Sequence, residues 1–372
     1  MYKIRAYADL HLYYNKDDMQ RYDDNELAKL KEELILNPPN MLVFCGDLCH
    51  MPYKADDIRF INTIKFVTEV VNICRKKNIQ FRIIQGTSSH DGKIVEILSN
   101  IFSNGDERHV KCFTTIAYEN LSNGLMIRYL PEPYFDSYSN FKEYAFSEKA
   151  DITFFHGSVD GVIPMISQKD SVTNLPKAVV IAQEDLMKYN RLFSAGGHIH
   201  KHVNIQDKIF YINSLTTHNF SDVGNRKGYM EFTIQDDKSW SWEYIVNDKA
   251  PAFVDHKIND IHLISKDDIR NIIGNILIMR KQGDKVRFTI TGEEGYTSTN
   301  NVAFIRALMK RYDIKIITKY KESIASEEET EDMEFFSDPS VSIDEKIKKI
   351  IDEEYHTDIS LKEIQKYIKI GE

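Results

Sequence analysis

The chain has 372 residues, of which 42% are hydrophobic and 28% charged, a composition typical of a globular protein with two or three domains. The net charge of −9 argues against a protein that coats nucleic acid through a broad basic surface. No apolar run approaches the roughly 20 residues of a membrane helix, and the N-terminus enters a strand pattern at once, so we expect a cytoplasmic protein without signal peptide or membrane span. The four cysteines form no CxxC pair and sit among apolar residues, which is typical of reduced, buried thiols.

The first two thirds of the chain alternate apolar runs of strand length with amphipathic helical patterns. Strands are predicted at Ile4–Ala8, Met41–Cys45, Ile79–Ile84, Leu125–Leu130, Ile152–Phe155 and Leu192–Ala195. Helical spacing connects Leu27, Leu30 and Leu34, and then Ile58, Ile61, Ile64 and Val71. After Gly197 the pattern is mostly β, at Phe210–Ile212, Tyr229–Ile234 and Trp240–Val246. This order predicts an α/β fold in which a layered β-sandwich carries flanking helices over residues 1–250.

The last third of the chain predicts smaller units beyond a boundary near Lys249–Pro251. Helix 267–279, strand 285–291, helix 300–312 and strand 314–318 predict a small α+β domain over residues 251–324. Residues 325–341 are acidic and lack periodicity, as in a flexible linker, and residues 342–372 carry two short amphipathic helices. The chain has no Walker-type phosphate loop, so we expect no ATPase activity of its own.

Five short polar motifs each follow directly on a predicted strand. They are Asp9-Leu10-His11, Gly46-Asp47-Leu48-Cys49-His50, Ser89-His90-Asp91, His156-Gly157 and Gly197-His198-Ile199-His200. Because the carboxyl ends of strands in an α/β sheet face a common crevice, we expect these side chains to meet. Imidazole and carboxylate together favour manganese, iron or zinc. Asp47 has oxygens free on two sides, which would allow it to bridge two ions about 3.5–4 Å apart.

The order of these motifs resembles that of the calcineurin-like metallophosphoesterases, and more closely that of the nuclease subunits of SbcCD-type DNA-repair complexes, phage counterparts included. The resemblance covers roughly residues 1–235. It implies a first metal ion on Asp9, His11, Asp47 and His200, and a second on Asp47, His156 and His198. It also implies that His90 is the catalytic histidine, and that His50 lies near the DNA phosphates. His90 would protonate the leaving oxygen or stabilise charge on the phosphoryl group.

One position departs from the family pattern. The family has GNHD at the third motif, and its Asn binds the second metal ion, whereas this chain reads Gly86-Thr87-Ser88-Ser89-His90-Asp91. Ser89 is the predicted replacement ligand. A hydroxyl is a poorer neutral ligand than an amide oxygen, so three alternatives stay open: weak binding of the second ion, a water in place of Asn, or Ser88 as the ligand.

The resemblance implies a DNA nuclease with two Mn²⁺ ions, or Mg²⁺, Fe²⁺ or Zn²⁺ in their place. It would act as an exonuclease on double-stranded ends and as an endonuclease on single strands. The partner would be a coiled-coil ATPase of the SbcC type, gripped by residues 342–372, with two copies of each subunit in a heterotetramer. The α+β domain would cap the DNA groove, and a phage-encoded protein would work in the host cytoplasm. Two alternatives remain: a phosphodiesterase for small molecules or nucleotides, and a scaffold with weakened catalysis.

Several other polar residues are expected to play lesser parts. His202 and His218 are read as bystanders or as supports behind the ligands. His109, His256, His262 and His356 are read as surface residues. The pair Arg226-Lys227 is interpreted as part of a solvated loop rather than as a phosphate contact.

Overall fold

The computed structural model describes residues 1–14, 16–102, 108–162, 178–259, 264–279, 283–292 and 315–320. The chain divides into two compact units, one of Met1–Asp255 with Asn275–Arg287 and the other of His256–Gly274 with the chain from Phe288 onward. The division therefore differs from the single boundary predicted near Lys249–Pro251. Within the described residues, no helix has the length and apolar character that crossing a membrane requires.

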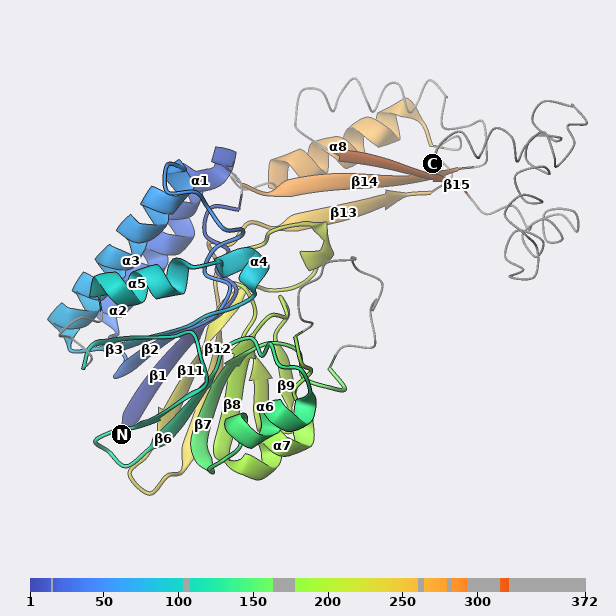
Figure 1. Ribbon diagram of the computed structural model, residues 1–372. Helices are drawn as coiled ribbons and strands as arrows, with labels where there is room; N and C mark the ends of the chain where they lie inside the picture. Colours follow the sequence, from blue (N-terminus) through green and yellow to red (C-terminus); the bar gives the residue numbers. More distant parts are fainter. Residues whose placement is uncertain are drawn as a thin grey trace, which may run out of the picture. The chain divides into compact units, whose positions relative to one another are not determined.

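The first sheet has six strands in the order β12-β11-β1-β2-β3-β4 (Figure 1). Its strands are β1 (Tyr2–Tyr7), β2 (Met41–Cys45), β3 (Gln80–Ile84), β4 (Val110–Phe113), β11 (Gly228–Ile234) and β12 (Trp240–Val246). The four strands β1 to β4 run parallel, whereas β11 is antiparallel to its neighbour β1, and β12 is antiparallel to β11. The bounds of β2 and β12 are those predicted from the sequence.

The second sheet also has six strands, in the order β5-β6-β7-β8-β10-β9. Its strands are β5 (Ala117–Asn120), β6 (Met126–Leu130), β7 (Ala150–His156), β8 (Asn190–Gly197), β9 (Val203–Ile205) and β10 (Ile209–Tyr211). The central strands β6, β7, β8 and β10 are parallel, and the edge strands β5 and β9 are antiparallel.

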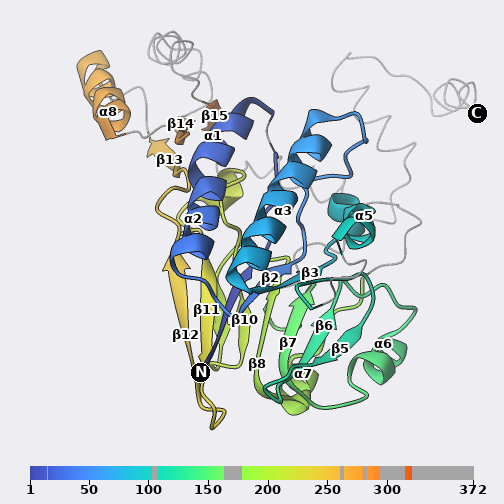
Figure 2. The same cartoon turned by 90° about the vertical axis from the view of Figure 1, so that its left-hand side faces the viewer.

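Helices cover the outer faces of both sheets (Figure 2). On the first sheet lie α1 (Met19–Tyr22), α2 (Ala28–Leu36), α3 (Ile58–Lys77) and α5 (Ile94–Phe102), and on the second lie α6 (Tyr138–Ala145) and α7 (Gln183–Tyr189). The long helix α3 is capped at its N-terminus by Asp57, whose side chain accepts a hydrogen bond from the amide of Arg59, and at its C-terminus by Asn78 in the left-handed conformation. The helix predicted around Leu30 ends at Leu36, just before Pro38 and Pro39.

The alternation of side chains along the strands produces three apolar layers. In β2, Met41, Val43 and Cys45 face the second sheet, whereas Leu42 and Phe44 face the helices α2, α3 and α5. A third layer joins the second sheet to α6 and α7. The protein is therefore a four-layered α/β sandwich of helices, sheet, sheet and helices, which confirms the predicted fold class.

The remaining described elements form a small three-stranded sheet in the order β13-β14-β15. They are β13 (Phe253–Ile258), α8 (Lys266–Met279), β14 (Lys285–Gly292) and β15 (Lys315–Tyr320), of which all but β13 were predicted within two residues at either end. The predicted helix 300–312, the acidic linker 325–341 and the helical segment 342–372 lie outside the described residues.

Candidate metal centre

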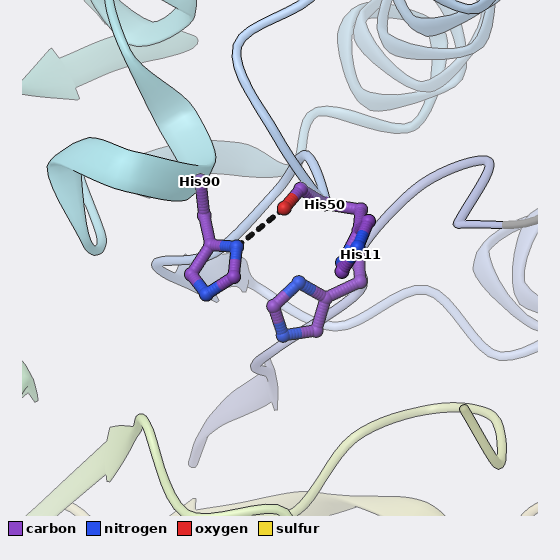
Figure 3. A group of neighbouring side chains, drawn as sticks. All are labelled: His11, His50 and His90. Carbon is purple, nitrogen blue, oxygen red and sulfur yellow. Dashed lines mark hydrogen bonds between the residues drawn. The ribbon is translucent and has the colours of Figure 1, made fainter. Parts of the chain in front are cut away.

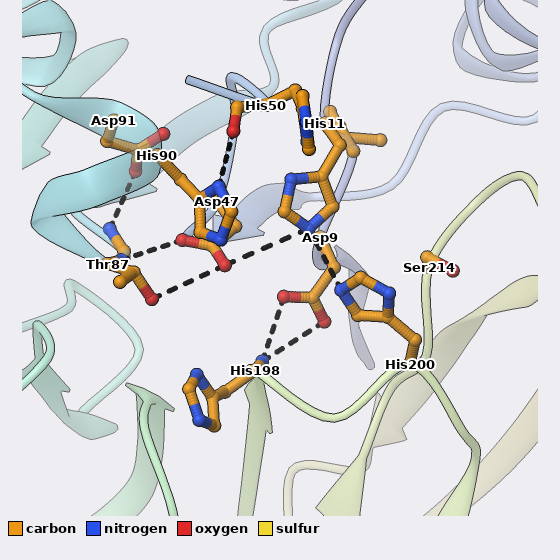
Figure 4. A network of polar contacts seen from close by, with 12 residues as sticks. Asp9, His11, Asp47, His50, Thr87, His90, Asp91, His198, His200 and Ser214 are labelled. Atoms are coloured by element: carbon orange, nitrogen blue, oxygen red, sulfur yellow. Dashed lines mark hydrogen bonds and ion pairs between the residues drawn. The ribbon is translucent and has the colours of Figure 1, made fainter. Parts of the chain in front are cut away.

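The motif residues lie at the carboxyl ends of parallel strands from both sheets. Asp9 follows β1, Asp47 follows β2, His90 lies in the short helix α4 (Ser88–Asp91) after β3, His156 ends β7 and His198 follows β8. Backbone hydrogen bonds tie the first two loops together, because the amide of Asp9 donates to the carbonyl of Gly46 at 3.1 Å and that of His11 to the carbonyl of Asp47 at 2.9 Å. Figure 4 shows the side chains converging on one place.

A first group of donors consists of Asp9, His11 and His200, whose ligand atoms all lie within 4.8 Å of one another. The Nε2 atoms of His11 and His200 face each other at 2.9 Å. Asp9 is fully buried and accepts the amide of His198 on both oxygens, at 2.8 and 3.1 Å. The first group therefore contains three of the four ligands expected for the first ion.

A second group consists of Asp47, His156 and His198, again within 4.8 Å of one another. Nδ1 of His156 bonds to the carbonyl of Cys45 at 2.9 Å, so the ring donates from Nδ1 and turns Nε2 toward Asp47. That Nε2 lies 3.3 Å from Oδ1 of Asp47. These three residues are the ones expected for the second ion.

Asp47 lies between the two groups. Its Oδ1 faces His156 and its Oδ2 lies 3.8 Å from Nε2 of His11. The amide of Thr87 donates to Oδ1 at 2.7 Å, which fixes the carboxylate. One carboxylate thus presents an oxygen to each donor group, as the predicted bridging role requires.

The backbone is strained at four of the six candidate ligands. Asp9, His11, Asp47 and His198 have φ values of 50°, 41°, 49° and 99°, in the region that residues with a Cβ rarely adopt. Each such residue costs on the order of 1–3 kcal/mol, so the surrounding structure must hold it in place. Strain gathered at one cluster of Asp and His is typical of a functional site.

Two glycines allow the loops to approach this closely. A Cβ on Gly46, whose φ is +81°, would lie 2.2 Å from Nδ1 of His156. A Cβ on Gly86 would lie 2.1 Å from the amide nitrogen of Asp47. Any other residue at these positions would displace a candidate ligand.

Burial, and the contacts that the candidate ligands make with one another, shift their pKa values. Burial lowers the pKa of His11 well below its usual value, with His218 and His200 adding to the effect, and burial together with His156 lowers the pKa of His198 to about 4. These rings are neutral at pH 7, which is the form that binds metals.

Asp47 and His156 stabilise each other's charged forms. Burial disfavours the charged form of Asp47, but His156 and His11 outweigh it and hold the pKa of the carboxyl well below its usual value. Burial likewise disfavours protonated His156, but Asp47 outweighs it and raises the pKa of the ring to about 10. Burial raises the pKa of Asp9 to about 6, although His200 and His156 counteract it.

The donor set fits two transition-type divalent ions. It offers imidazole and carboxylate only, with a shared carboxylate in the middle, and Nδ1 of His11 is buried without a hydrogen-bond partner among the described residues. Facing ring nitrogens, neutral imidazoles and a buried carboxylate are all stabilised by a positive ion between them.

His50 and His90 form a further group with His11, whose ligand atoms all lie within 4.8 Å of one another (Figure 3). Nδ1 of His90 bonds to the carbonyl of His50, which leaves Nε2 free to face the site. The rings of His11 and His90 are 4.7 Å apart, and those of His11 and His50 are 5.7 Å apart. This places His90 where a proton donor next to the ions would stand.

The structure favours Thr87 over Ser89 as the hydroxyl near the second group. Ser89 and Ser88 are both exposed. Oγ1 of Thr87 lies 3.4 Å from Nε2 of His156 and 3.5 Å from Oδ2 of Asp47. The two extra residues in this loop move the expected position of the hydroxyl from Ser89 to Thr87.

Glu132 lies beside the site and had no place in the sequence prediction. It follows β6, and its Oε1 lies 3.8 Å from Nδ1 of His198. Its position after a strand is the same signal that identified the other motifs, but a lone Glu between two prolines matches no motif.

Lys227, read from the sequence as part of a solvated loop, is only 2% exposed. Its ammonium group donates to the carbonyl of His200 at 3.0 Å and pairs with Asp222 at 2.7 Å. The solvated-loop interpretation is therefore wrong for Lys227, although its neighbour Arg226 is exposed. Lys227 supports the loop that carries His200.

The remaining histidines and cysteines follow a simple pattern. His218 is buried against the rings of His11 and His200, at 4.9 and 5.5 Å, and thus supports the first group. His202 stacks on Tyr244 at 4.3 Å. His109 and His256 are half-buried, and His262 and His356 lie outside the described residues. All four cysteines are free, and three of them are buried.

Comparison with known proteins leaves the family open. No family model matches the chain. TT1561 of Thermus thermophilus is similar at 10% identity and a TM-score of 0.37, covering 65% of this chain and 98% of its own. Another solved structure has 11% identity and a TM-score of 0.40 over the same shares of the two chains. Because both values are low, neither similarity says anything about chemistry.

Proposed function

We propose that the protein is a phosphodiesterase that holds two divalent metal ions and hydrolyses DNA. The observation that carries this proposal is the pair of donor groups on either side of Asp47, one with Asp9, His11 and His200 and the other with His156 and His198. When bound, two such ions supply Lewis-acid charge for an in-line displacement at phosphorus. Manganese is the metal that we propose, since the ligands mix imidazole with carboxylate.

The residues around the ions divide into ligands and a proton donor. His90 has its Nδ1 engaged with the carbonyl of His50, so Nε2 can hold the proton that the leaving oxygen needs. The ring of His11 lies 4.7 Å from that of His90 and 4.7 Å from that of His200, so His90 lies next to the first donor group. His50 is half-buried beside them and is available to a phosphate of the substrate.

DNA as the substrate rests on the resemblance of the five motifs to SbcCD-type nucleases. On the same ground we propose cleavage of double-stranded ends and of single strands, a coiled-coil ATPase as the partner, and action in the cytoplasm. The order of the five motifs along the chain supports these proposals.

Cleavage by wild type and His90→Ala tests the proposal. The substrates are end-labelled duplex DNA, single-stranded DNA and a chromogenic phosphodiester, each with Mn²⁺, alone and with a coexpressed ATPase subunit. We expect wild type to cleave DNA, and His90→Ala to lose about 10²–10⁴-fold in turnover while retaining its metal ions. His109→Ala is the matched control.

The possible outcomes separate the three candidate functions. Turnover of the chromogenic ester without cleavage of DNA would favour a phosphodiesterase for small molecules. Fewer than two bound ions and no turnover would favour a scaffold. Unchanged turnover in His90→Ala would remove His90 from the mechanism.

A further inference from the structure

Glu132 lies beside the second donor group and is the third carboxylate of the site, after Asp9 and Asp47. It lies between Pro131 and Pro133 at the end of β6, and β6 is the parallel neighbour of β7, which carries His156. The strand end therefore directs it to the same edge of the sheet as the other candidate ligands. Its side chain is only 4% exposed, and its Oε1 lies 3.8 Å from Nδ1 of His198.

The other oxygen of Glu132 is held by the protein. The hydroxyl of Tyr134 donates to Oε2, and the amide of Ser88 in turn donates to that hydroxyl at 3.2 Å. One carboxylate oxygen is thus fixed while the other faces His198. An orienting hydrogen bond behind a carboxylate is typical of metal ligands.

A buried carboxylate requires a positive partner. The ion-pair partner that the described residues give Glu132 is His198, which is itself a candidate ligand. A cation beside Oε1 would stabilise the charged form of this buried carboxylate, whose other oxygen accepts the hydroxyl of Tyr134.

We propose that Glu132 is a ligand of the cation held by Asp47, His156 and His198, in the place that the family gives to Asn. This inference rests on the proposed metal centre. An anionic ligand replaces a neutral amide, so the missing Asn does not leave the second ion weakly bound. The site then has two carboxylates and two imidazoles, with Thr87 at its side.

Titration of the metal-free protein with Mn²⁺ tests the assignment, with bound Mn²⁺ followed by electron paramagnetic resonance and by equilibrium dialysis. Wild type should bind two ions whose spins couple. We expect Glu132→Ala to reduce the affinity for one of the two ions by about tenfold or more. The spectrum of two coupled spins should then be lost. Glu132→Gln should bind this ion less tightly than wild type but more tightly than Glu132→Ala, because its amide oxygen can still bind the ion. Tyr134→Phe should reduce the affinity for the same ion by a smaller factor than Glu132→Ala does.

The control is Glu143→Gln, which makes the same change of charge at an exposed position of α6. It should bind Mn²⁺ like wild type. If Glu132→Ala does not fold, the Mn²⁺ affinity of Glu132→Gln tests the assignment in its place. Two coupled ions of wild-type affinity in the Glu132 variants would overturn the assignment and leave the proposed function standing. A wild-type protein that binds fewer than two Mn²⁺ ions would overturn both.

Discussion

The Nε2 atoms of His11 and His200 lie 2.9 Å apart, although the two residues are 189 positions apart in the chain. Two neutral ring nitrogens that face each other repel unless a proton or a cation lies between them. The pair is a direct consequence of the fold, because β1 and β8 deliver their loops to the same edge of the sandwich.

His200→Gln should therefore reduce the bound Mn²⁺ from two ions to one. A ligand that binds only the folded protein at a hundred times its Kd adds about 2.7 kcal/mol to the free energy of unfolding. We expect His200→Gln to lose the part of the free energy of unfolding that one bound ion contributes. Urea unfolding with and without Mn²⁺ measures it, with His202→Gln as the control, and equal stabilisation of both variants would contradict the prediction.

Binding of Mn²⁺ should release a proton from His156. Asp47 raises the pKa of this ring to about 10 in the metal-free protein, whereas an unfolded histidine has a value near 6.5. Because the folded value is the higher one, the protonated ring stabilises the metal-free fold fully below pH 6.5, and that contribution is lost as the pH rises through about 10.

The metal must displace this proton, so Mn²⁺ affinity should rise with pH up to about 10. Calorimetry near neutral pH in buffers of different ionisation enthalpy should show that about one proton leaves His156 for each chain that binds metal. A binding enthalpy that is the same in every buffer would count against the assignment of His156 as a ligand.

Lys227→Met should destabilise the fold and loosen the loop of His200. The substitution leaves Asp222 buried without its ion-pair partner and removes the donor to the carbonyl of His200. Loss of one member of a buried pair costs about 3–5 kcal/mol. Arg226→Met, at the exposed neighbour, should change the free energy of unfolding by less than about 0.5 kcal/mol. Similar unfolding curves for the two variants would refute a supporting role for Lys227.

Thr87→Val should weaken the binding of the second Mn²⁺ ion, whereas Ser89→Ala should not. The hydroxyl of Thr87 lies between Asp47 and His156, and that of Ser89 is exposed. We expect a several-fold loss of affinity in the first variant, measured by Mn²⁺ titration. The reverse result would restore Ser89 as the hydroxyl beside the second donor group.

The sandwich could be predicted because its strands carry strong local signals. Met41–Cys45 is apolar throughout since both of its faces are covered, and its bounds are as predicted. The short edge strands β4, β5 and β9 were missed, because their residues are partly exposed and carry weak patterns.

The candidate ligands could be predicted because strand ends in a parallel sheet share an edge. Glu132 and Thr87 could not be identified in the same way. Their places depend on the path of the loops after β3 and β6, where Tyr134 bonds to the amide of Ser88 across the two segments. The burial of Lys227 depends on Asp222 and His200, which no local pattern connects to it.

Anomalous diffraction from crystals of the protein grown with Mn²⁺ tests the central claim most directly. Data on either side of the manganese absorption edge should show two peaks about 3.5–4 Å apart, on opposite sides of the Asp47 carboxylate. One peak should lie within bonding distance of Asp9, His11 and His200, and the other within that of His156 and His198. A single peak, or peaks away from Asp47, would contradict the account.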